Sequence, residues 1–81
     1  MDRKALRALE NAAIERARAQ AKANRLRDKG MLADAKAARA EVAANRVAWK
    51  ETAQTAGAYA AERKALEDSA DQAAYARLGG V

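Results

Sequence analysis

The side chains that most often carry catalysis or bind metals are missing from this 81-residue sequence, which contains no His and no Cys. The usual general base, the thiol nucleophile and the nitrogen and sulfur metal ligands are therefore absent. Ser69 is the only serine, and neither a base nor oxyanion donors accompany it in the sequence. Glu67 and Asp71 share one helix face, but such a pair is more often a solvated surface than a cation site. The sequence thus predicts no enzyme, no metal, no cofactor and no small-molecule substrate.

A row of basic residues in the first third of the chain is the strongest chemical signal. Residues 1–29 hold nine Lys and Arg against four Asp and Glu, whereas residues 30–81 hold seven of each, so the net charge of +5 belongs to the first segment. The basic stripe, our name for this row, lies on one helix face and consists of Lys4, Arg7, Arg18, Lys22, Arg25 and Lys29. Like charges one turn apart repel, and an anionic partner would relieve that repulsion.

Three kinds of anionic partner suit such a stripe: nucleic acid, an acidic protein or an anionic membrane. No aromatic residue interleaves with the stripe, and no DNA- or RNA-binding signature is present, which argues against nucleic acid. The small apolar face of the same segment argues against a membrane. A solubilising face without a partner is the alternative to all three.

Helices must position these residues, because the chain contains 26 alanines, no Pro and only four Gly. Residues 2–29 follow a helical pattern in which Ala5, Leu9, Ala19 and Ala23 share a face. Basic residues precede Gly30, which is typical of a helix end closed by a left-handed glycine. So short a link predicts that the next helix turns back on the first.

The stretch from Met31 onward carries a second apolar stripe in a strict seven-residue repeat, which is typical of helices that wrap around one another. Three polar residues also fall on this stripe: Asn45, Thr52 and Arg63. They either set the register of the helices or the choice of partner, or occupy loosely packed positions. The larger side chains of the stripe are predicted to make helix–helix or partner contacts: Val42, Trp49, Tyr59 and Leu66.

These patterns predict an all-α fold in one small domain over 1–81: an antiparallel hairpin with coiled-coil-like, Ala-rich packing and a long second helix. We expect a helix over about 3–28, a turn over about 29–31 and a helix over about 32–78. Thr52, Thr55 and Gly57 weaken the second helix. A three-helix bundle with a break near 52–57, or a bend there, is therefore the alternative.

A chain with only 15 apolar residues larger than Ala builds a small core, which favours a partner or self-association. We therefore expect a non-enzymatic protein–protein interaction or assembly element, such as an adaptor, an inhibitor or a small structural subunit. The alternative is a nucleic-acid-associated protein that contacts phosphates through residues 1–29. The composition is loosely similar to that of small helical virion and accessory proteins of tailed bacteriophages, which implies a particle subunit. With no apolar run of about 20 residues and no signal-peptide pattern, we expect a cytoplasmic or virion protein, neither secreted nor transmembrane.

Overall fold

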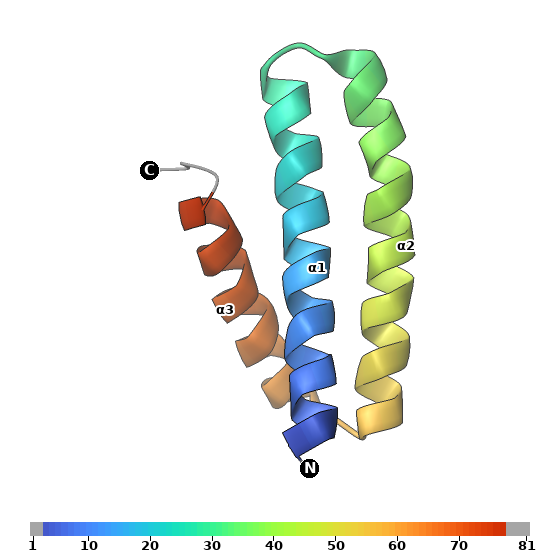
Figure 1. Ribbon diagram of the computed structural model, residues 1–81, viewed down its shortest axis with the longest axis vertical. Coiled ribbons are helices and arrows are strands. Elements are labelled where there is room, and N and C mark those ends of the chain that lie inside the picture. Colours follow the sequence, from blue (N-terminus) through green and yellow to red (C-terminus); the bar gives the residue numbers. More distant parts are fainter. Residues whose placement is uncertain (1–2, 78–81) are drawn as a thin grey trace.

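The prediction of an all-helical fold is confirmed by a computed structural model that describes residues 3–77, without the side chains of residues 75 and 77. This part of the chain contains three helices and no strand: α1 (Arg3–Asp28), α2 (Leu32–Ala56) and α3 (Ala60–Arg77). Figure 1 shows α1 in the middle, with α2 and α3 on its two sides. α1 packs against both neighbours, whereas α2 and α3 contact each other little.

The link between α1 and α2 is a tight turn closed by Gly30. Gly30 has φ +77°, the left-handed conformation that glycine adopts without steric cost. Its N–H donates to the Arg27 carbonyl at 2.9 Å, and the Met31 N–H donates to the Leu26 carbonyl at 3.0 Å. These two bonds form a Schellman motif, which satisfies the last carbonyls of α1 and sends the chain back along it.

The second helix ends earlier than expected. The prediction of one continuous helix over about 32–78 is wrong, because α2 ends at Ala56 and α3 begins at Ala60; residue 78 itself lies outside the described residues. Gly57 has φ +68°, and the Gly57 and Ala58 N–H groups donate to the Gln54 and Ala53 carbonyls, both at 3.1 Å. The chain therefore repeats the Schellman motif at Gly57, inside the stretch where a break was the alternative.

All three helices meet toward the end of the molecule that holds the α2–α3 turn. There the three helices close around Leu9 and Trp49, which are 0% and 5% exposed, together with small residues that include Ala13, Ala53 and Ala70. A second buried cluster joins α1 to α2 alone, through Ala19, Ala23, Ala38 and Val42. Most of the buried positions in both clusters are alanines, so the helices pack through small side chains and bury little apolar area.

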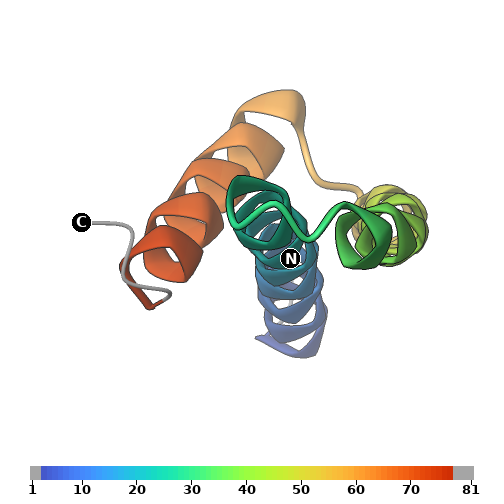
Figure 2. The same cartoon turned by 90° about the horizontal axis from the view of Figure 1, so that it is seen from above.

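The opposite end of the molecule is open, since α3 leans away from α2 (Figures 1 and 2). One row along α1 explains this opening. It begins with the buried Leu9 and Ala13 and continues, at helical spacing, with polar residues: Arg16, Gln20, Asn24 and Arg27. Burying such groups without partners costs free energy, so α2 and α3 do not close over them.

Candidate interaction surfaces

The acidic residues that sequence analysis considered for a cation are engaged by other side chains. Glu67 Oε1 accepts a hydrogen bond of 2.6 Å from Trp49 Nε1, and Asp71 Oδ1 pairs with Arg16 at 2.9 Å. Ser69 is exposed, and its neighbour Asp68 pairs with Lys64 at 3.6 Å. Among the residues that the structure describes, no group of three or more acidic side chains is arranged to hold a metal ion.

The basic stripe divides into three parts with different surroundings. Arg18 pairs with Glu15 of the same helix at 3.3 Å, and Lys22 pairs with Glu41 of α2 at 3.4 Å. The other four residues of the stripe line two hollows in the surface. Lys4 and Arg7 line the first hollow, and Arg25 and Lys29 line the second. All six residues are exposed, and the charges of the middle two are partly compensated by their acidic neighbours, Glu15 and Glu41.

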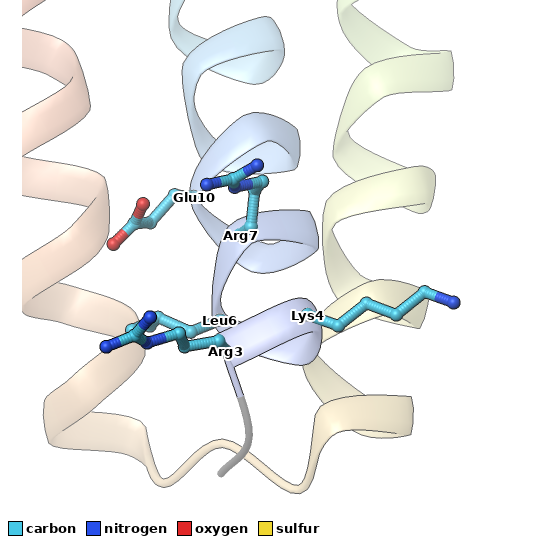
Figure 3. A pocket seen from close by; sticks show the side chains of 5 residues that line it. All are labelled: Arg3, Lys4, Leu6, Arg7 and Glu10. Carbon is cyan, nitrogen blue, oxygen red and sulfur yellow. The ribbon is translucent and has the colours of Figure 1, made fainter.

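The first hollow lies on the surface of α1 near its start and measures about 420 Å³ (Figure 3). It is lined by five residues of this one helix: Arg3, Lys4, Leu6, Arg7 and Glu10. Figure 3 shows Glu10 reaching toward α3 and Lys4 extending to the opposite side. Within the described part of the chain, none of the three basic residues takes part in an ion pair. The hollow is a shallow cationic surface.

The second hollow, which we call the interhelical groove, measures about 820 Å³ and is bounded by all three helices. α1 supplies its floor, α2 contributes Arg46, and α3 contributes Asp71 and Ala74. On the floor, Gln20 Nε2 donates to Asn24 Oδ1 at 3.0 Å, while Arg46 Nη2 donates to Gln20 Oε1 at 3.1 Å. A polar network at the bottom of an open groove is suited to a polar or charged ligand.

The charge of the groove is positive. Its lining contains five basic residues and two acidic ones. Two of the basic residues are compensated, because Arg16 pairs with Asp71 and Arg27 pairs with Asp28. The three that remain, Arg25, Lys29 and Arg46, are in no ion pair among residues 3–77. An anion entering the groove therefore meets uncompensated positive charge.

The outer face of α2, turned away from α1, carries a further apolar stripe. It consists of exposed residues at alternating steps of four and three: Ala33, Ala37, Ala40, Ala44 and Val47. Val47 is 57% exposed, and nearby Leu32 is 67% exposed. This stripe has the same seven-residue period as the buried stripe of α2 but lies on the other side of the helix.

The four residues that were predicted to make contacts lie in different environments. Val42 and Trp49 are buried, and Leu66 is half-buried against the cluster around Leu9. Tyr59 lies in the link between α2 and α3 and is 77% exposed, so it is not part of the core of this chain. Of the two kinds of contact predicted for Tyr59, the contact with a partner protein remains a prediction.

Sequence reasoning missed both the interhelical groove and the outer face of α2. The groove exists because of where α3 lies, which local sequence patterns do not give. The only sequence feature that pointed to it was the row of polar residues from Arg16 onward, next to the apolar face of the first helix. The outer face had a plain signal: a second set of residues with heptad spacing. Alanine occurs on every side of α2, so the pattern of Ala alone does not distinguish a buried side from an exposed one.

Comparison of the chain with protein-family models, with curated proteins and with solved structures found no match. The surfaces described above therefore carry the functional interpretation by themselves. In the described part of the chain, no helix is both long enough and apolar enough to span a bilayer.

Proposed function

We propose that this protein is a non-enzymatic helical interaction element that assembles with a helix of another chain through the outer face of α2. The observation that carries this proposal is the exposed apolar stripe from Ala33 to Val47. Such a stripe, repeated every seven residues, is what two helices need in order to pack side by side along their length. Because most of its members are alanines, the two helix axes can approach to the short end of the usual 8–10 Å range.

The partner helix that best fits this face is α2 of a second copy. The two edges of the face carry opposite charges, with Lys36 and Lys50 on one edge and Asp34 and Glu41 on the other, all four exposed. Glu41 also pairs with Lys22 of its own chain at 3.4 Å. When two copies pack in parallel, the basic edge of one meets the acidic edge of the other. In an antiparallel pair, each edge would meet its own like charges, so charge complementarity selects the parallel dimer.

The contact is small, so the association is expected to be weak. The stripe spans about 20 Å of helix, and alanine side chains bury little area. An interface of this size falls below the roughly 1,200 Å² that stable complexes bury. We therefore expect a dimer that forms as the protein concentration rises and dissociates on dilution.

Sedimentation equilibrium over a range of concentrations tests the proposal. Ala44→Glu places a charge in the middle of the outer face and should abolish the dimer. Ala65→Glu makes the same change at an exposed position of α3 and should leave the dimer unchanged. A wild-type protein that stays monomeric at millimolar concentration, or equal effects of the two substitutions, would contradict the proposal.

Disulfide trapping tests the orientation, because the chain has no cysteine of its own. Ala33→Cys should cross-link to itself in a parallel dimer, where the two copies of this position lie side by side. In an antiparallel dimer it would instead cross-link to Val47→Cys when the two variants are mixed. Efficient trapping of the mixed pair alone would refute the parallel arrangement.

A nucleic-acid-associated function is the second candidate, and the hollow near the start of α1 favours it. Arg3, Lys4 and Arg7 are exposed there on the first turns of α1 and extend in different directions, and their positive charges suit contacts with phosphates (Figure 3). The hollow has no aromatic side chain on which a base can stack. We rank this function below assembly for that reason.

The wider setting of the protein stays a prediction. The loose similarity in composition to small virion proteins of tailed bacteriophages suggests a particle as the assembly. Purification from the native source, with identification of the proteins that accompany the chain, tests this prediction.

A further inference from the structure

The interhelical groove offers a second recognition surface, distinct from the outer face of α2. Positive charge is concentrated where α1 ends, because Arg25, Arg27 and Lys29 line this end of the groove. Arg46 of α2 adds a charge further along the groove, where it donates to Gln20 Oε1 at 3.1 Å. These donors call for a ligand that supplies several negatively charged acceptors.

The groove is large enough to receive a short stretch of helix. A helix about 10 Å across advances 5.4 Å per turn, so one turn fills roughly 420 Å³. The groove, at about 820 Å³, is comparable in volume to two such turns. Its side toward α3 is built of small residues, Ala17, Ala21 and Ala74, which permit close approach of another backbone. A helix placed between α2 and α3 would fill the side on which those two helices separate (Figure 2).

The groove already holds one carboxylate, because the Arg16 guanidinium binds Asp71 at 2.9 Å. Arginine recognises planar carboxylates well, through its fixed fork of donors. The lining lacks aromatic side chains for stacking nucleobases, and its polar floor and excess positive charge suit a charged ligand. These observations favour a carboxylate-bearing helix over a nucleic acid or an apolar ligand.

We infer that the interhelical groove binds an acidic helix of a partner protein, which lies between α2 and α3 and sets its carboxylates against Arg25, Arg27, Lys29 and Arg46. The inference rests on the proposed function because in both cases the partner is a helix of another protein chain. Binding in the groove uses a different surface from assembly through the outer face of α2, so either proposal can fail without the other.

A labelled helical peptide tests the inference. The probe is an end-capped alanine-rich peptide of about 18 residues with a row of glutamates along one face, and the control peptide has glutamine at the same positions. Arg27→Gln with Arg46→Gln removes two charges from the groove, whereas Lys4→Gln with Arg7→Gln removes two from the hollow near the start of α1. All four residues are exposed, so both double variants should keep their helix content.

Fluorescence anisotropy should show binding of the glutamate peptide, with affinity at least tenfold lower for the groove variant and within twofold of wild type for the other. Peptide-induced shifts in nuclear magnetic resonance should appear at the side-chain amides of Gln20 and Asn24 and not at the exposed Gln54. If the groove variant loses helix content, Arg25→Gln with Lys29→Gln replaces it.

Three results would overturn the inference: equal loss in both double variants, equal affinity for the glutamine peptide, or no binding at millimolar peptide in low salt. Displacement of the peptide by duplex DNA with the same Gln20 and Asn24 shifts would assign the groove to nucleic acid instead. Sedimentation equilibrium of the groove variant separates the two proposals. If this variant no longer binds the peptide but still forms the dimer, the outer face of α2 is the assembly surface and the groove is a separate binding site.

Discussion

Trp49 links two helices that otherwise contact each other little. Its ring is buried beside Leu9, and its Nε1 donates across to Glu67 of α3 at 2.6 Å. We predict that Trp49→Ala lowers the free energy of unfolding by about 3 kcal/mol or more, because burial and packing of the ring are both lost. Trp49→Phe keeps most of the ring and loses the hydrogen bond, for which we expect about 1 kcal/mol. Urea unfolding followed by circular dichroism measures both changes.

A double-mutant cycle isolates the hydrogen bond from the packing. Glu67→Gln keeps an acceptor within reach of Trp49 and should cost little, whereas Glu67→Ala should match the loss seen in Trp49→Phe. The coupling between Trp49→Phe and Glu67→Ala is then expected to be about 1 kcal/mol. Fully additive effects would show that the bond between Trp49 and Glu67 does not stabilise the fold.

The roles of individual carboxylates were the least predictable part of the candidate sites. Glu67 and Asp71 share a helix face, which the sequence pattern shows, but their partners Trp49 and Arg16 are distant in the chain. Which side chain a surface carboxylate meets depends on how α3 packs on α1, and local periodicity does not contain that information.

Gly30 and Gly57 end two helices by the same geometry, with φ of +77° and +68°. We predict that Gly57→Ala destabilises the protein by about 1–2 kcal/mol, because a Cβ disfavours the left-handed conformation. No described atom outside residues 56–58 lies within 4 Å of the position of such a Cβ, so the cost is conformational and not a clash. Gly57→Asn should cost less, because Asn tolerates this conformation better. Urea unfolding of the two variants compares these costs.

An unchanged or raised stability of Gly57→Ala would indicate that the chain continues as one helix through this position. Small-angle X-ray scattering provides an independent check. A helix over 32–78 would be roughly 70 Å long, whereas the longest extent of the molecule is 42 Å. A marked lengthening of the Gly57→Ala variant would show the continuous helix directly.

The turn at Gly30 was predictable, and the one at Gly57 was not, for a physical reason. Arg25 and Arg27 precede Gly30 in the last turn of α1, a favourable arrangement at a helix end. Around Gly57 the flanking residues are alanines, and the seven-residue repeat runs through without a slip. A helix interior tolerates glycine at a cost of about 1 kcal/mol, so the packing of α3 on α1 decides between continuing and turning.

The distribution of charge over the molecule governs its response to nucleic acid. The net charge of +5 favours weak, salt-sensitive attraction to duplex DNA, without sequence preference. We predict an electrophoretic shift at low salt that disappears at physiological salt. Lys4→Glu with Arg7→Glu should weaken it more than Arg18→Glu with Lys22→Glu, since the latter two residues already pair with Glu15 and Glu41. Tight binding that persists at physiological salt would place nucleic acid ahead of assembly.

The two buried clusters imply that the molecule does not open all at once. The cluster of Ala19, Ala23, Ala38 and Val42 contains no residue of α3, so the α1–α2 pair keeps part of its packing when α3 detaches. Detachment of α3 is therefore a local unfolding event that needs less free energy than global unfolding. Hydrogen exchange should show α3 amides exchanging by this route before those of α1 near Ala19, and equal protection of both helices would show a single cooperative unit. In the intervals when α3 is detached, Leu9 and Trp49 meet water, so the lifetime of the docked form sets how long the protein hides these two buried side chains from proteases and from other chains.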